Sequence, residues 1–120
     1  MRILLVGAGG VGTAFARIAA RRRFAELIIA DYDLGRAQHA AAARDGYQAV
    51  QLDARDEAAT AALLAEHSCD VLMNATDPRF VMPLFTAARS YTAITICFQS
   101  LLLPQDAIRP SSNLIPCGLI

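Results

Sequence analysis

Four glycines stand within six positions of the sequence VGAGGVG, residues 6–12, directly after a short apolar run. Glycine loses the most backbone entropy on folding, at a cost of about 0.5–1 kcal/mol relative to alanine inside an element. Gly7, Gly9 and Gly12 have the G-x-G-x-x-G spacing. In such a loop the first glycine permits a tight turn, the second admits a diphosphate close to the backbone, and the third lets a helix pack on a strand. The pattern therefore predicts a diphosphate site.

The residues on either side of the glycines supply the context that such a site needs. Residues 2–6 predict a buried strand, and apolar side chains then recur at helical spacing as far as the arginines at 21–23. A helix that starts at the glycines presents free backbone N–H groups, and its dipole favours negative charge. Asp31 follows a second predicted strand, nineteen residues beyond Gly12. A carboxylate there accepts hydrogen bonds from a ribose, so a dinucleotide site is predicted; the alternative is a tight turn without a ligand.

The choice between NAD and NADP depends on the charges that follow the second predicted strand. Asp31 and Asp33 both lie near the position that the 2′-phosphate of NADP would take. Like charges about 4 Å apart repel by roughly 4 kcal/mol at an effective dielectric near 20. Against this, Arg36 at the start of the next helix is able to turn toward a phosphate. These charges favour NAD, with NADP as the alternative.

Two later loops contribute further candidates. The segment LDARD at 52–56 follows the third predicted strand, and in this topology it passes the adenine. Asp53 and Ala54 are therefore candidates to contact the edge of the adenine ring. Asp53 is equally well explained as a turn residue or cap. The segment NATDP at 74–78 follows the fourth strand, at the edge where open α/β sheets bind ligands. Asn74 either lies beside the diphosphate and inner ribose or satisfies backbone groups of its own loop. The candidate cofactor-binding residues are Gly7, Gly9, Gly10, Val11, Gly12, Asp31, Asp53, Ala54, Asn74 and Ala75.

Apolar runs alternate with alanine-rich, charged segments along the chain, which is typical of repeated strand–helix units. Strands are predicted at 2–6, 27–30, 48–52, 70–75 and 93–98, and helices at 11–23, 34–44 and 83–89. A further helix, with Asp56 as its cap, is predicted to run to about residue 66. Crossover connections of this kind give a parallel sheet. The expected fold is α/β, a Rossmann-like doubly wound sheet of order 3-2-1-4-5 in one domain. Residues 1–100 form the dinucleotide-binding domain, and 101–120, with three prolines, form an irregular apolar tail that packs over the sheet or is poorly ordered.

The composition excludes several classes of function. The formal net charge is zero, so no basic surface points to nucleic acid or to an anionic membrane. All 11 cationic residues are arginine, which excludes Schiff-base chemistry and a Walker-type phosphate-loop lysine within this chain. The three cysteines fit neither a disulfide framework nor a zinc pattern, so we expect reduced thiols, a cytoplasmic location and no metal. No apolar run approaches the roughly 18 residues of a membrane span.

Four segments together resemble the N-terminal domain of the saccharopine dehydrogenase family over about residues 1–90. They are the glycine loop, IIADYD at 28–33, VQLDARD at 50–56 and CDVLMNATDPRFVMPLFTAA at 69–88, of which the last is the most specific. The resemblance implies a domain that binds NAD or NADP and a larger second domain that supplies most substrate-binding and acid–base residues. Family members commonly carry arginine after the acidic residue, where it lies against the adenine. Here Tyr32 takes that place, and we expect it to stack on the base.

The chain departs from the family after residue 90. The segment RSYTAITICFQS at 89–100 lacks the glycine-containing turn and the acidic strand end, and the second domain is absent from the sequence. Three origins are compatible with this: a piece of a longer enzyme, a natural stand-alone domain, or a product whose C-terminal part has lost the ancestral reading frame. The apolar tail and a truncated sheet edge also predict association, either with a second copy or with a missing catalytic domain.

No catalytic set is recognisable in the sequence. His39 and His67 are expected on helices away from the carboxyl ends of the strands, and no serine has a base in a recognisable arrangement. We therefore expect an oxidoreductase-derived NAD(P)-binding domain that is inactive by itself, with an undetermined substrate. One alternative is a regulatory nucleotide-sensing module similar to potassium-transport regulators. Another is a folded relic that binds nothing.

Overall fold

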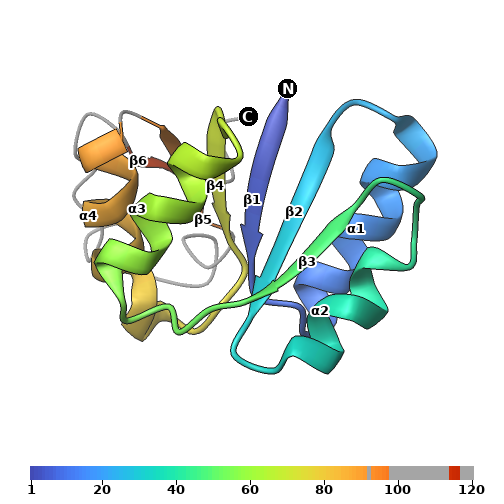
Figure 1. Ribbon diagram of the computed structural model, residues 1–120, viewed down its shortest axis with the longest axis horizontal. Coiled ribbons are helices and arrows are strands. Elements are labelled where there is room, and N and C mark those ends of the chain that lie inside the picture. Colours follow the sequence, from blue (N-terminus) through green and yellow to red (C-terminus); the bar gives the residue numbers. More distant parts are fainter. Residues whose placement is uncertain (92, 98–113, 117–120) are drawn as a thin grey trace.

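The computed structural model describes residues 1–91, 93–97 and 114–116. A parallel sheet in the order β3-β2-β1-β4-β5-β6 forms its centre (Figure 1). The strands are β1 Arg2–Val6, β2 Glu26–Asp31, β3 Gln48–Gln51, β4 Val71–Asn74, β5 Ile94–Cys97 and β6 Leu114–Pro116. The helices are α1 Gly10–Arg22, α2 Leu34–Ala41, α3 Glu57–Glu66 and α4 Val81–Tyr91, with a short 3-10 turn, η1, at Pro78–Phe80. The order of the first five strands confirms the Rossmann-like sheet predicted from the sequence.

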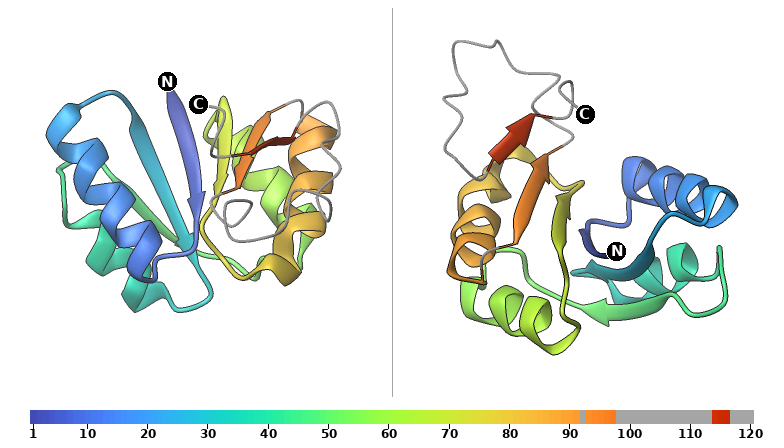
Figure 2. Two further views of the ribbon diagram at one scale, coloured as in Figure 1. Left: turned by 180° about the vertical axis from the view of Figure 1, so that it is seen from behind. Right: turned by 90° about the horizontal axis from the view of Figure 1, so that it is seen from above.

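Alternate side chains of the central strand enter two separate cores. Ile3 and Leu5 of β1 pack with small side chains of α1 and α2, chiefly alanines. Leu4 and Val6 pack on the other side with Leu64 of α3, and with apolar side chains of α4. Figure 2 shows the two helix pairs on opposite faces of the sheet. Because successive side chains of a strand point to opposite faces, the unbroken apolar run at 3–6 is what a doubly covered central strand needs.

Strand register brings the loops of the candidate site to one edge of the sheet. Val6 pairs with Ala30 on one side and with Asn74 on the other. Consequently the glycine loop, the segment after β2 and the segment after β4 all leave the sheet at the same level. This edge is where parallel α/β sheets bind ligands.

Two helices differ from their predicted bounds by more than one residue. Helix α2 ends at Ala41 rather than at 44, because the N–H groups of Ala43 and Arg44 bond to carbonyls three residues back, at 3.3 and 3.4 Å, and tighten the last turn. Helix α4 begins at Val81 rather than at Pro83. Pro83 then falls within the first turn, where its missing N–H removes no helical hydrogen bond.

The sheet gains a sixth strand from the segment expected to be irregular. Thr95, Ile96 and Cys97 of β5 pair in parallel with residues 114–116. The remainder of the predicted tail lies outside the described residues, as do residues 98–100 of the predicted domain. Residues 114–116 are thus a short strand that the sequence did not predict, and it forms by backbone pairing with the edge of β5. The prediction of an irregular tail is not tested for the remaining residues.

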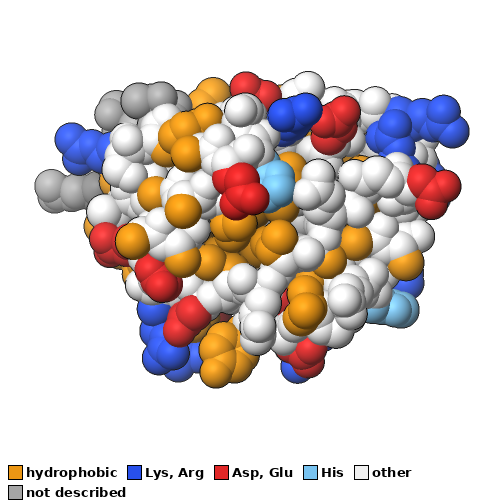
Figure 3. Space-filling view, viewed as in Figure 1, with side chains coloured by type: hydrophobic (Ala, Val, Ile, Leu, Met, Phe, Trp, Pro, Cys, Tyr) orange, Lys and Arg blue, Asp and Glu red, His pale blue; other side chains and the backbone are white. Residues whose placement is uncertain are grey.

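The surface has no single dominant charge on the face seen in Figure 3. Hydrophobic side chains gather at the centre of that face, and acidic and basic side chains are interspersed around them. Within the described part of the chain, no helix is both long enough and apolar enough to span a bilayer.

Candidate functional site

The first and third glycines of the loop are required by the protein's own packing. Gly7 has a φ of +103°, and a Cβ added there would lie 2.7 Å from the carbonyl oxygen of Ala75. A Cβ on Gly12 would overlap the carbonyl oxygen of Gly7. The backbone of β1, the start of α1 and the end of β4 therefore approach too closely for any side chain. These are the roles that the G-x-G-x-x-G spacing assigns to its first and third positions.

The second glycine and its neighbour have no such explanation. Apart from the adjoining residues of the loop and helix, a Cβ added to Gly9 or Gly10 would meet no atom of the described residues within 4 Å, and both glycines are exposed. Their φ values do not demand glycine, since the positive-φ glycines are Gly7 and Gly46. Omission of a side chain at Gly9 therefore leaves open space beside the backbone, as the close approach of a diphosphate requires.

The N-terminus of α1 is free to receive an anion. Gly9 is the N-cap, no side chain caps the helix, and its first turn contains no acidic residue. The first helical bond of the turn runs from the Thr13 N–H to the Gly9 carbonyl at 2.9 Å, so the N–H groups of residues 9–12 have no acceptor among the described residues. Unpaired donors and the positive end of the helix dipole together form a site suited to a phosphate.

Asp31 joins the end of β2 to the glycine loop. Its Oδ2 accepts the Ala8 N–H at 2.7 Å, and its Oδ1 accepts the Asp33 N–H at 2.8 Å. Each carboxylate oxygen has two acceptor positions, so one on each oxygen stays available. The half-buried carboxylate both fixes the loop and presents acceptors to hydroxyl groups.

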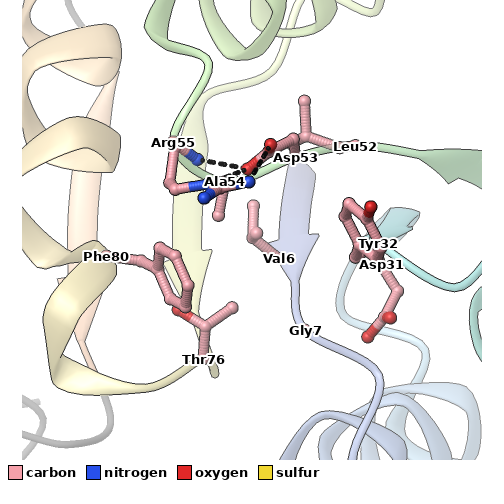
Figure 4. A pocket seen from close by; sticks show the side chains of 10 residues that line it. All are labelled: Val6, Gly7, Asp31, Tyr32, Leu52, Asp53, Ala54, Arg55, Thr76 and Phe80. Carbon is pink, nitrogen blue, oxygen red and sulfur yellow. Dashed lines mark hydrogen bonds and ion pairs between the residues drawn. The ribbon is translucent and has the colours of Figure 1, made fainter.

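A cavity of about 310 Å³ lies between the loops that follow β1, β2, β3 and β4 (Figure 4). Of the residues predicted from the sequence, it brings together Gly7, Asp31, Tyr32, Asp53 and Ala54. The other predicted residues do not line it; they are Gly9, Gly10, Val11, Gly12, Asn74 and Ala75. The lining residues that the sequence did not predict are Val6, Leu52, Arg55, Thr76 and Phe80. Arg55 and Phe80 belong to the segments LDARD and NATDPRF, which were already identified from the sequence. Their closeness in the sequence to predicted site residues was the signal by which they could have been predicted.

Asp53 is paired with its neighbour Arg55. The Oδ1 of Asp53 accepts the backbone N–H of Arg55 at 3.0 Å and its Nε at 3.1 Å, while Oδ2 accepts Nη2 at 2.9 Å. The bonds from the guanidinium hold the pKa of the Asp53 carboxyl below its usual value, and the Asp53 side chain in turn raises the pKa of Arg55. The backbone of Asp53 also accepts the Asp56 N–H at 2.9 Å, which is the turn role that the sequence left open.

Asn74 is fully buried at the end of β4. Its Oδ1 accepts the backbone N–H of Thr76 at 2.9 Å and the Thr76 hydroxyl at 2.6 Å. These bonds correspond to the structural alternative for this residue, in which it satisfies groups of its own loop. Contact between Asn74 and a ribose stays a prediction.

The segment that follows β2 contributes one aromatic ring to the cavity wall and contains one ion pair. Tyr32 is 71% exposed although it lines the cavity, so one face of its ring is available. Asp33 caps α2 by accepting the N–H groups of Gly35 and Arg36, and its carboxylate lies 3.7 Å from the Arg36 Nε. Arg36 is therefore balanced by Asp33 rather than left as an isolated positive charge.

Across the described residues, no group of three His, Cys, Asp or Glu side chains is arranged to hold a metal ion.

The fold, the glycine loop and the strand-end carboxylate define an NAD(P)-binding domain of the Rossmann type. The sequence matches the model of the saccharopine dehydrogenase NADP-binding domain over residues 3–109, and the chain belongs to that family. The match extends beyond the first 90 residues on which the resemblance rested, and it does not favour the alternative of a potassium-transport regulator. No curated protein sequence is significantly similar to the chain.

Solved structures share the fold at low sequence identity. Apo saccharopine dehydrogenase (L-Glu forming) from Saccharomyces cerevisiae superposes with a TM-score of 0.72 at 21% identity, over 93% of this chain and 22% of that one. UDP-glucose-4-epimerase from Stenotrophomonas maltophila, solved with bound NAD, gives 0.68 at 19% identity, over 81% and 36%. The dTDP-glucose 4,6-dehydratase from Bacillus anthracis in complex with NAD gives 0.69 at 14% identity, over 97% and 44%. The chain thus spans about a fifth of the length of the yeast enzyme.

Proposed function

We propose that this chain is the cofactor-holding part of a saccharopine dehydrogenase-like oxidoreductase and that it binds NAD in preference to NADP. The bound nicotinamide group would supply hydride transfer, which is chemistry of the cofactor itself. The chain's own residues would bind and orient it. The uncapped N-terminus of α1 at residues 9–12 would hold the diphosphate, Asp31 would hold the adenosine ribose, and the cavity beside Tyr32 would hold the adenine.

The observation that carries this proposal is the open space at Gly9. Packing explains Gly7 and Gly12, but among the described residues, apart from the two chain neighbours, no atom lies within 4 Å of a Cβ at Gly9. Glycine is an accepted N-cap residue, but no contact in the described part of the chain requires it at this position. A diphosphate close to that backbone supplies the missing reason.

The preference for NAD rests on the two carboxylates beyond β2. Asp31 and Asp33 lie two residues apart, and the Oδ1 of Asp31 accepts the Asp33 N–H at 2.8 Å, so both carboxylates are at the ribose end of the site. A 2′-phosphate would bring up to two negative charges to these groups. Arg36 is already opposed by Asp33 and offsets that repulsion only in part.

Catalytic turnover requires substrate-binding and proton-transfer groups in addition to the residues that line the cavity. Among the described residues, no histidine or cysteine lines the cavity, and the ionisable side chains that line it are Asp31, Tyr32, Asp53 and Arg55. We propose that a separate substrate domain, of the kind that makes up most of the length of the yeast enzyme's chain, supplies substrate binding and proton transfer. The substrate is then selected outside this chain.

Calorimetric titration with NAD and with NADP tests the proposal. Gly9→Val is expected to abolish binding, because the new side chain fills the space of the diphosphate. Ala62→Val adds bulk at an exposed position of α3, away from the cavity, and is expected to bind like the parent chain. If neither dinucleotide binds the parent chain at millimolar concentration, the proposed function is wrong.

A further inference from the structure

The adenine end of the cavity has two flat groups that come from different loops. Tyr32 follows β2 and Arg55 follows β3, and both line the cavity. In Figure 4 they lie on opposite sides of it, with Val6 and Ala54 between them. A phenol ring and a guanidinium plane both stack favourably on aromatic rings.

Arg55 is held in place although it is exposed. Three hydrogen bonds from this one residue reach the Asp53 carboxylate, two of them from the guanidinium, at 3.1 and 2.9 Å. A guanidinium fork on a carboxylate fixes the plane as well as the position of the group. An exposed arginine without this partner would lose side-chain entropy on stacking, whereas Arg55 is already ordered.

The same bonds limit what Asp53 can offer to a base. Its Oδ1 accepts two hydrogen bonds and is saturated, and Oδ2 accepts one, so a single acceptor position is left on the carboxylate. A hydrogen bond from the 6-amino group of adenine would have to compete with the guanidinium at that oxygen. The carboxylate is thus better placed to orient Arg55 than to read the edge of the base.

We propose that Tyr32 and Arg55 form an adenine clamp, in which the base is held by stacking between the two groups, and that Asp53 is a positioning residue that holds Arg55. This assignment rests on the proposed function. It also specifies how the base is selected. The clamp accepts a flat purine and discriminates little between substituents at position 6 of the purine, because stacking uses the face of the ring rather than its edge.

The chain contains its own control for the arginine. Asp77 and Arg79 repeat the arrangement of Asp53 and Arg55, with the Arg79 backbone N–H and Nε both 3.0 Å from the Asp77 Oδ1. Neither Asp77 nor Arg79 lines the cavity. Arg79→Ala therefore removes one exposed, carboxylate-paired arginine from the same end of the molecule without removing a wall of the cavity.

Titration of the full chain with three ligands tests the clamp: NAD, nicotinamide hypoxanthine dinucleotide and nicotinamide mononucleotide, which lacks the adenosine. We expect Arg55→Ala to weaken NAD about tenfold, within the range for stacking on one base. Asp53→Ala is expected to weaken it to a similar extent, and the double variant to be no weaker than Arg55→Ala alone. Arg55→Lys keeps the charge but loses the plane, so most of the loss should persist. Arg79→Ala should bind NAD as the parent chain does, and the mononucleotide should be insensitive to all of these changes.

The two dinucleotides separate stacking from edge recognition. The parent chain is expected to bind them within about threefold of each other, since both bases stack. Discrimination of more than tenfold against hypoxanthine that disappears in Asp53→Ala would overturn the proposal, because Asp53 would then read the 6-amino group directly. So would an Arg55→Ala variant that binds NAD as well as Arg79→Ala does. Loss of all dinucleotide binding in the parent chain would instead refute the proposed function, and the clamp with it.

Discussion

The carboxylate of Asp31 accepts the backbone N–H of Ala8 at 2.7 Å, across 23 residues of sequence. The bond connects the end of β2 to the middle of the glycine loop, next to the exposed N-terminus of α1. An acidic residue here therefore organises the glycine loop without any ligand. In the proposed function the same side chain also contributes, together with Asp33, to the preference for NAD.

Replacement of Asp31 is expected to weaken both the fold and the site. Asp31→Ala leaves the N–H groups of Ala8 and Asp33 without their acceptor, and a hydrogen bond to a charged group contributes about 1.5–3 kcal/mol when it is well shielded. Because Asp31 is half-exposed, we expect a loss of roughly 1–2 kcal/mol in urea unfolding. Asp31→Asn keeps one acceptor oxygen and should be intermediate. Equal stability of all three proteins would show that the loop does not depend on this bond.

The glycines should separate into structural and ligand-binding positions. Gly12→Ala puts a methyl group into the carbonyl of Gly7, so α1 must shift away from the sheet and the unfolding midpoint should fall clearly. Gly9→Ala adds the same methyl group where no described residue other than its neighbours lies within 4 Å, so its stability should fall by no more than about 1 kcal/mol, the cost of alanine at an N-cap. Urea unfolding of the two variants is the measurement. A Gly9→Ala variant as strongly destabilised as Gly12→Ala would mean that packing, not a ligand, requires that glycine.

Removal of one carboxylate should shift cofactor preference toward NADP. Asp33→Ser keeps a side-chain oxygen that can cap α2, but it removes the charge opposed to Arg36. Arg36 then becomes available to a 2′-phosphate. We expect the ratio of NADP to NAD affinity to rise about tenfold in calorimetric titrations at low salt, and the gain to shrink as ionic strength increases. An unchanged ratio would show that Asp33 has no part in the choice.

Cys69 should remain a neutral thiol well above physiological pH. Burial, together with the nearby Asp70, raises its pKa from 9.0 to about 11. The unfolded chain loses this proton at lower pH than the folded chain does, so stability should fall between pH 9 and 11, by at most about 1.4 kcal/mol per pH unit. In a variant that carries Cys97→Ser and Cys117→Ser, iodoacetamide should modify the native protein slowly at pH 8.5 and the urea-unfolded protein rapidly. Equal rates in both states would contradict the raised pKa.

The sequence by itself determined the local features and their order. The repeated strand–helix units, beginning with the apolar run at 3–6, were sufficient to predict the order of the first five strands, which the structure confirms. The glycine loop and the acidic residue at 31 also predict a diphosphate at Gly9, and this stays a prediction. Asp56 was also correctly predicted to cap α3. These features rest on local physics: backbone freedom, periodicity of apolar residues and capping involve residues close together in the chain.

Only the tertiary structure decided what lies across the site. The bond from Ala8 to Asp31, the overlap of Gly12 with the backbone of Gly7, and the approach of Tyr32 and Arg55 to one cavity depend on how separate strand ends meet. Strand β6 likewise forms because its backbone pairs with the edge of β5. No pattern within residues 114–116 predicts this strand. Packing between distant segments sets these contacts, and the composition of each segment alone leaves them open.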